Sequence, residues 1–463
     1  MRRQFAWSFA AKGLGLILPP LLLVFLARVL EPADFGLFAL LTIVIATIQT
    51  VMTGPLGEVI VQSKREDICD FIFTAQLLLG MLAAGLLVLF ADALAAFFHK
   101  PELASPLQVY SLLLLINPFV DTAIRLNMRK IAFKAVFIRR IVTPIGNAMI
   151  SVPLALYNFE YWALVWGQIG GFTLGAVVVL AMDDWRPRMN FDYRQSIDDL
   201  RFSSQMVLQG MVRWVRSQSD KAILGYHITL DSLGQYDMAR QLASLPYAVV
   251  VDPVAQVMYS VMSDKVRSSE EICSLFLLAQ RRVLLVTFPL CVLLVLNAEG
   301  LVLFILGVKW LEISPLFALV VVVGALSSLV RANTEVFKAM GKPKVMTQFM
   351  LVRAAFTLPV FLLLAPAGVY ALALGVLMLA IIFSPINVYL TLRILRVRVI
   401  DYIQEVLLRP VFVAVGVGVV NMVLLQLPLD QVVGTLLNVC ASGGVVLVAA
   451  IYWERDLFKW KRS

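Results

Sequence analysis

The stretch from Val369 to Leu392, VYALALGVLMLAIIFSPINVYLTL, contains no charged residue and is followed directly by Arg393. A helix of this length crosses a hydrocarbon core of about 30 Å, and the few polar residues in the run, such as Ser384 and Asn387, are uncharged. The stretch therefore predicts a transmembrane helix over residues 369–393, and the rest of the chain can be compared with it.

Apolar runs of similar length recur along the whole chain. About 60% of the 463 residues are apolar and 15% are charged, whereas soluble proteins are usually about one quarter charged. A soluble domain of this composition would lack a polar surface, so the sequence predicts an all-α polytopic membrane protein with about fourteen transmembrane helices. The predicted spans lie near 5–29, 36–60, 70–98, 105–126, 136–157, 160–182, 202–226, 233–262, 275–297, 314–337, 346–365, 369–393, 404–426 and 432–453. The first is interpreted as a retained helix, since no small-residue cleavage site follows its apolar run.

The distribution of the basic residues predicts the orientation. The net charge is +9, but the basic residues recur in short clusters between apolar runs instead of forming one patch, which argues against nucleic-acid binding. With both termini in the cytoplasm, about 29 of the 39 Lys and Arg residues fall on the cytoplasmic side and about 3 outside. The sequence therefore predicts a multi-pass inner-membrane protein with cytoplasmic termini.

Three pairs of short segments repeat in the same order at near-constant spacing. They are Pro32–Phe38 with Leu230–Tyr236 (offset 198), Ser105–Leu107 with Ser314–Leu316 (offset 209), and Tyr161–Leu164 with Val369–Leu372 (offset 208). A six-helix unit that occurs twice in one orientation is a parallel repeat, as in transporters whose site lies between two lobes. We therefore expect an N-terminal six-helix lobe, a cytoplasmic linker, a second six-helix lobe around a central cavity, and two further helices with a cytoplasmic tail, at 1–184, 185–200, 201–395 and 396–463.

The seventh predicted helix carries a polar stripe at membrane depth. Gln205, Gln209, Arg213, Arg216 and Asp220 are spaced by four, four, three and four residues, so they share one helix face. Charged groups in lipid cost about 2.5–3.5 kcal/mol each, so this face is expected to turn towards the protein interior or a wet cavity. Arginine presents a planar fork that suits phosphate oxygens. Two interpretations stay open: a substrate site, or an internal ion pair of Arg216 with Asp220.

Other intramembrane charges are weaker candidates. Lys12 precedes Pro19-Pro20, which are expected to kink the first helix, and it joins the proposed substrate site. Asp237 and Arg240, just inside the eighth helix, are candidate gating residues, and Asp252 before Pro253 is a candidate proton site. Asp121 and Arg125 are predicted to form a structural pair within one helix.

The sequence predicts neither an enzyme nor a resident cofactor. It contains no Walker A loop, HExxH or GxSxG motif, and its two histidines and four dispersed cysteines exclude a histidine-rich metal site and a disulfide framework. Any work must therefore come from a proton or sodium gradient, from the substrate gradient, or from another protein.

Several segments in order along the chain resemble one transporter family. Ser219–Gly225 followed by Leu233–Leu242 is similar to the motif D-x-x-x-L-G … L-G-x-Y-x-x-A-x-x-L of the polysaccharide-export flippases (Wzx and colanic-acid exporter type) of the MOP superfamily. The further matching segments are Leu30–Gly36, Phe98–Leu103, Leu306–Trp310 and Gly341–Pro343.

This resemblance implies two lobes around a cationic cavity, and a substrate of oligosaccharide linked to undecaprenyl pyrophosphate that is flipped to the periplasmic leaflet. It also implies membrane lipids and the polymerase or export proteins of a polysaccharide pathway as partners. The rivals are a multidrug antiporter, which would need acids where this chain has arginines, and a peptidoglycan-precursor flippase. A membrane polymerase is a third rival, but it would carry a large periplasmic loop that this chain lacks.

Overall fold

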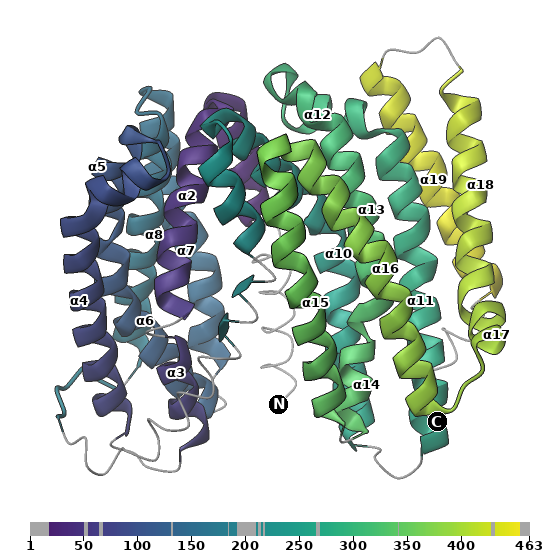
Figure 1. The fold of residues 1–463 in the computed structure, drawn as a ribbon, viewed down its shortest axis with the longest axis horizontal. Coiled ribbons are helices and arrows are strands. Elements are labelled where there is room, and N and C mark those ends of the chain that lie inside the picture. Colours follow the sequence, from purple (N-terminus) through teal and green to yellow (C-terminus); the bar gives the residue numbers. More distant parts are fainter. Residues whose placement is uncertain are drawn as a thin grey trace. The chain divides into compact units, whose positions relative to one another are not determined.

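The computed structural model describes residues 18–50, 54–63, 68–130, 133–183, 185–191, 210–211, 214–215, 218–264, 269–340, 342–426 and 431–453. Over these ranges the chain is helical and contains no strand, which confirms the predicted all-α class (Figure 1). The chain divides into two compact units, Met1–Asp237 and Met238–Ser463. The lobe boundaries predicted above follow the internal repeat and stay a prediction.

The first unit is a bundle of apolar helices. Its described helices are Leu18–Val29, α2 (Pro32–Ile48), α3 (Gly54–Gln62), α4 (Ile68–Phe97), η2 (Pro101–Leu103), α5 (Ala104–Tyr110), α6 (Leu112–Arg129), α7 (Phe133–Leu156), α8 (Tyr161–Met182), residues 218–227 and the start of α10 (Leu230–Asp264). Within this bundle, α6 packs against α4 and α8, and α7 packs along α8.

Glycines bring α7 and α8 into close contact. Gly167, Gly171 and Gly175 stand four residues apart on one face of α8. A Cβ on Gly167 would lie 2.5 Å from Asn147 Oδ1, and one on Gly171 would lie 2.6 Å from the carbonyl oxygen of Thr143. Small residues allow membrane helices to approach this closely. Within lipid the hydrophobic effect does not drive helices together, so close packing of this kind holds them in contact.

The second unit continues from α10 to the C-terminal helix. Its further elements are α11 (Ser269–Leu296), α12 (Ala298–Ile305), η4 (Val308–Ile313), α13 (Ser314–Arg331), α14 (Asn333–Ala339), α15 (Pro343–Leu364), η5 (Ala365–Ala367), α16 (Val369–Leu395), α17 (Val399–Tyr402), the π-helical η6 (Ile403–Leu407), α18 (Leu408–Leu424) and α19 (Gln431–Trp453). Side chains from α11, α14, α16 and η6 form one apolar core in this unit.

A buried asparagine network fastens the last two helices to the rest of the second unit. The Asn297 side chain donates to Asn421 Oδ1 at 2.7 Å, Asn421 donates to Ser442 Oγ at 2.7 Å, and Asn438 donates to Asn297 Oδ1 at 2.9 Å. All four side chains are buried. Hydrogen bonds of this kind hold helices together where no water competes for the polar groups.

Eight of the described helical segments are long and apolar enough to cross a membrane, and shorter apolar helices accompany them. Two predicted spans agree closely with the structure: 160–182 with α8 and 369–393 with α16. The total of fourteen stays a prediction, because parts of the expected helices lie outside the described residues.

Two predicted spans are each divided by a single turn residue in the structure. The run at 105–126 gives α5 and α6, separated at Ser111, and the run at 314–337 gives α13 and α14, separated at Ala332. The Gln280 amide donates to the carbonyl oxygens of Ser328 and Leu329 at 3.4 and 3.0 Å, and Asn333 donates to Asn387 Oδ1 at 2.7 Å. These side chains supply hydrogen bonds at the second break, so the chain tolerates it inside an apolar environment.

Candidate substrate site

Most of the predicted cationic site falls outside the described part of the chain. Lys12, Gln209, Arg213 and Arg216 are not among the described residues, and the Asp252 side chain is likewise outside the description although α10 passes through it. The described members of the candidate set are Asp220, Asp237 and Arg240, and all three belong to the first unit or to α10 just after it.

Asp220 is buried and engaged by the next helix. Its side chain lies in the helical segment 218–227, and the Tyr236 hydroxyl of α10 donates to its Oδ2 at 2.8 Å. This end of the predicted polar stripe therefore turns towards a neighbouring helix, where the carboxylate receives a hydrogen bond in place of water.

Lys221 and Asp237 form a second link beside the first. Their Nζ and Oδ1 atoms are 2.5 Å apart, and their side chains are 15% and 10% exposed. Both links join residues sixteen positions apart, so consecutive residues of one helix bind consecutive residues of the next. Arg240 is half-buried one turn further along α10. Asp237, a predicted gating residue, is thus part of a helix-to-helix ion pair.

Helical spacing does not reveal the partners of these two acids, which are Tyr236 for Asp220 and Lys221 for Asp237. Arg216, the partner for Asp220 that the spacing suggests, lies outside the described residues, so that interpretation stays open. The signal was present in the family-like motif, since Asp220-Lys221 and Tyr236-Asp237 are the polar positions of its two halves. Helical spacing relates only residues of one helix, and each of these pairs joins two different helices. Only the fold therefore shows the pairing.

A second polar cluster lies in the first unit. The predicted pair of Asp121 and Arg125 is confirmed, with Nε and Oδ1 3.2 Å apart. Arg125 also binds Glu58 at 2.8 Å, and the Gln76 amide donates to Asp121 Oδ2 at 3.0 Å. The cluster joins α3, α4 and α6, and its two acids share one arginine. Within the described ranges, no group of three His, Cys, Asp or Glu side chains has the arrangement of a metal site.

The sequence model of the family described as "Polysaccharide biosynthesis protein" matches residues 25–315, which include the Asp220–Tyr236 and Lys221–Asp237 links. The chain belongs to this family. Among its relatives, the succinoglycan biosynthesis transport protein ExoT of Rhizobium meliloti (strain 1021) is 24% identical over 77% of this chain and 72% of the relative. The lipopolysaccharide biosynthesis protein WzxC of Escherichia coli (strain K12) is 20% identical over 84% of this chain and 80% of the relative.

Solved structures show the same fold. The lipid II flippase MurJ in an inward closed conformation aligns with a TM-score of 0.78 at 14% identity, covering 98% of this chain and all of the MurJ chain. A multidrug resistance MATE family transporter of the MOP superfamily, in an inward-facing conformation, aligns with a TM-score of 0.63 at 11% identity over 81% of this chain and 94% of that one. At these identities the likeness shows the fold alone.

The family membership, the relatives and the apolar helices agree on the class of protein. This chain is a multi-pass inner-membrane protein of the polysaccharide biosynthesis family, with a fold like that of MurJ and the MATE family transporter. The predictions of family and class made from the sequence are confirmed.

Proposed function

We propose that this polysaccharide biosynthesis protein flips an oligosaccharide linked to undecaprenyl pyrophosphate from the cytoplasmic to the periplasmic leaflet. The pyrophosphate binds Arg213 and Arg216, with Lys12, Gln209 and Asp220 beside them in a central cavity. The polymer served is an exopolysaccharide, a capsule or an O-antigen. The protein works by alternating access between lobes at 1–184 and 201–395, joined by 185–200, with 396–463 as the added helices and tail.

The observation that carries this proposal is the buried position of Asp220. Arg213 and Arg216 stand seven and four residues before Asp220, a spacing that predicts one shared face on the seventh predicted helix. Because Asp220 faces protein and not lipid, the same face at the arginines is expected to turn inward as well. An inward arginine pair without water offers charge-assisted hydrogen bonds to a pyrophosphate.

The relatives support the choice of substrate class. ExoT is a transport protein of succinoglycan biosynthesis, and MurJ is a lipid II flippase. Both termini face the cytoplasm in this proposal, Asp237, Arg240 and Asp252 serve gating or coupling, and a proton or sodium gradient drives the cycle. The partners are membrane lipids and the polymerase or export proteins of the pathway.

Complementation of a deletion strain tests the proposal. Strains with Arg213→Ala or Arg216→Ala are expected to accumulate lipid-linked oligosaccharide in the cytoplasmic leaflet. The variants Arg213→Lys and Arg216→Lys are expected to recover part of the flipping. Arg398→Ala is the control, because Arg398 is an exposed arginine paired with Asp401. Normal flipping by both alanine variants would rule out the assigned site. Accumulation of a drug instead of the lipid-linked sugar in a strain without the protein would favour the antiporter alternative.

A further inference from the structure

The break between α13 and α14 is made by side chains and not by a helix-breaking residue (Figure 1). The residues from Ser327 to Asn333 include neither proline nor glycine. The Gln280 amide of α11 donates to the carbonyl oxygens of Ser328 and Leu329, at 3.4 and 3.0 Å. A side chain that inserts into the backbone hydrogen bonds of a helix is a known cause of a kink.

The first repeat has no break at the equivalent position. The offset of 209 residues that relates Ser105 to Ser314 also relates Ile124 to Asn333. Ile124 is a buried residue of α6, which runs without interruption from Leu112 to Arg129. The helix equivalent to α13 therefore continues through this position where the side chain is apolar, so the fold itself does not require the break.

Three buried oxygen atoms at the break have no hydrogen-bond partner among the described residues. They are Gln280 Oε1, Asn333 Oδ1 and the hydroxyl oxygen of Tyr402. Gln280 and Asn333 are 0% exposed, and Tyr402 is 2% exposed. Buried polar groups in native proteins are nearly always hydrogen-bonded, to other protein groups or to ordered water. These three atoms therefore indicate a ligand.

The three side chains surround the same point of the second unit. Gln280 reaches Leu329, and Asn333 stands four residues after Leu329, on the other side of the break. Phe276 precedes Gln280 by one helical turn, and its ring stacks on that of Tyr402 with the centroids 6.4 Å apart. The Gln280 side chain is close enough to act on the Tyr402 hydroxyl, but no direct hydrogen bond joins the two.

The chemistry of these atoms favours a neutral ligand that donates hydrogen bonds. Gln280 Oε1 and Asn333 Oδ1 only accept hydrogen bonds, so they cannot hold an anion. None of the three side chains carries a charge that would compensate a bare cation in this apolar core. A water molecule can donate to both carbonyl oxygens and accept from the hydroxyl, and about three hydrogen bonds are typical of a buried water.

We propose that a buried water molecule binds at this break, between Gln280, Asn333 and Tyr402, and makes the break a pivot for α14. Gln280 is bonded to the end of α13, and Asn333 fastens the start of α14 to Asn387 of α16 at 2.7 Å. The water thus joins the two sides of the break. Ordered water restores hydrogen bonding where a membrane helix is interrupted, and it can change partners as the angle between two helix segments changes. The inference does not depend on the identity of the substrate.

Hydroxyl-radical footprinting with X-rays on the purified full chain in detergent tests for the water, because radicals form from bound water and modify adjacent side chains. Tyr402 is expected to be modified several-fold faster than Tyr247. Tyr247 is the matched control, since it is a buried tyrosine of the same unit whose hydroxyl donates directly to the carbonyl oxygen of Val321 at 2.8 Å. Modification of Tyr402 no faster than that of Tyr247 would overturn the proposal, and this measurement requires no substitution.

A double variant that copies the apolar residue of the first repeat tests the pivot. Asn333→Ile with Asn387→Leu removes an acceptor of the water together with the bonded neighbour, so neither asparagine leaves the other without its partner. Modification of Tyr402 is expected to fall to the level of Tyr247. Hydrogen–deuterium exchange of the α14 backbone amides is expected to slow several-fold, because the break becomes rigid.

Thr357→Val is the control for the double variant. Thr357 is a buried residue of α15 whose hydroxyl donates within its own helix, to the carbonyl oxygen of Arg353 at 2.8 Å. This variant is expected to leave both Tyr402 modification and α14 exchange unchanged. Unchanged Tyr402 modification in the double variant would overturn the assigned water ligands. Loss of that modification with unchanged α14 exchange would overturn the pivot.

Discussion

Gly36 of α2 and Gly234 of α10 lie backbone against backbone, and neither position has room for a side chain. A Cβ on Gly36 would overlap the carbonyl oxygen of Leu230, and a Cβ on Gly234 would overlap that of Pro32. The two glycines are equivalent positions of the internal repeat, and so are Pro32 and Leu230, at the same offset of 198 residues. The contact is therefore reciprocal, as at a local twofold axis, and it lies within the first compact unit.

Adding a side chain at this glycine contact is expected to separate the two helices. Gly36→Val and Gly234→Val should each lower the free energy of unfolding by about 1–3 kcal/mol, the usual cost of overpacking, and reduce transport. Thermal unfolding in detergent and the leaflet assay measure the two effects. The double variant should cost less than the sum of the single ones, because one separation relieves both clashes.

Gly85→Val is the matched control for this prediction. Gly85 lies in α4, and an added Cβ there meets no atom within 4 Å. This variant is expected to unfold like the unaltered protein. Equal melting temperatures for Gly36→Val and Gly85→Val would show that the close approach in the structure does not limit stability.

Removal of the Tyr236 hydroxyl is expected to destabilise the link to Asp220. Tyr236→Phe takes a donor from a buried carboxylate, which should cost about 1–3 kcal/mol of unfolding free energy. Tyr370→Phe is the control, because its hydroxyl donates to the carbonyl oxygen of Glu312 at an exposed site. Chemical denaturation of both variants checks the prediction. A loss for Tyr370→Phe as large as that for Tyr236→Phe would contradict it.

Breaking one half of the Lys221–Asp237 pair is expected to cost more than replacing both halves. Lys221→Met leaves the Asp237 carboxylate buried without its cation, at a cost of about 3–5 kcal/mol, whereas Lys221→Met with Asp237→Leu should recover much of the loss. Thermal unfolding of the single and double variants measures the difference. A loss as small as that of Asp401→Ala, which breaks an exposed pair, would show that burial does not strengthen the link.

The buried asparagine network is expected to hold α18 and α19 in place. Asn421→Leu removes the bonds to Asn297 and Ser442 and leaves both partners buried, so the free energy of unfolding should fall by about 1–3 kcal/mol. Limited proteolysis near the α18–α19 connection is expected to become faster. Met422→Leu, at a neighbouring exposed position, is the control. Unchanged proteolysis in Asn421→Leu would mean that apolar packing alone fastens these helices.

Residue patterns within one helix determine spans and pairs that the sequence alone predicts. The span predicted at 369–393 agrees with α16, because the demand for an uninterrupted apolar run in lipid is a one-dimensional property of the chain. Asp121 and Arg125 were paired correctly for the same reason, since four residues make one turn of a helix. The family resemblance likewise depended on short local motifs and is confirmed by the match over residues 25–315.

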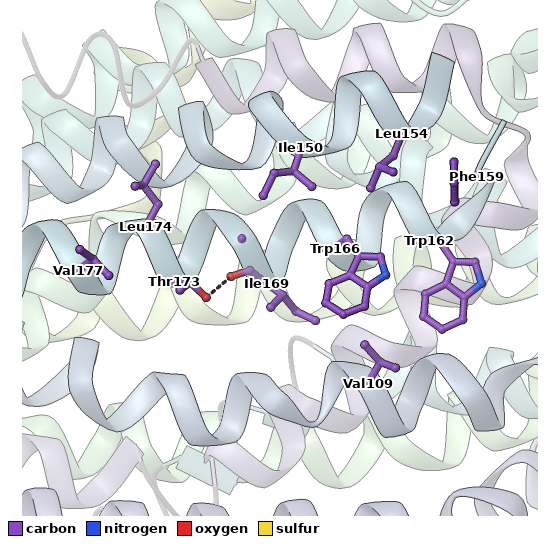
Figure 2. Close-up of a pocket in the computed structure, with 11 residues that line it drawn as sticks. Val109, Ile150, Leu154, Phe159, Trp162, Trp166, Ile169, Thr173, Leu174 and Val177 are labelled. Carbon is purple, nitrogen blue, oxygen red and sulfur yellow. Dashed lines mark hydrogen bonds between the residues drawn. The ribbon is translucent and has the colours of Figure 1, made fainter. Parts of the chain in front are cut away.

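Contacts between helices needed the folded chain. The spacing of residues does not predict that Arg125 binds Glu58, 67 positions away. Nor does it predict that Asp220 accepts a hydrogen bond from Tyr236 of the next helix. The repeat showed that Gly36 and Gly234 are equivalent, but equivalence does not say that two positions touch. An apolar groove of about 810 Å³ along α8, lined by Trp162, Trp166 and Val177 among others, is equally unpredictable from the sequence (Figure 2). Its lining side chains belong to the same apolar runs as any lipid-facing ones. Helices form because local residue patterns favour them and because lipid requires each segment to satisfy its own backbone hydrogen bonds. Which helices become neighbours depends on how they pack together in three dimensions.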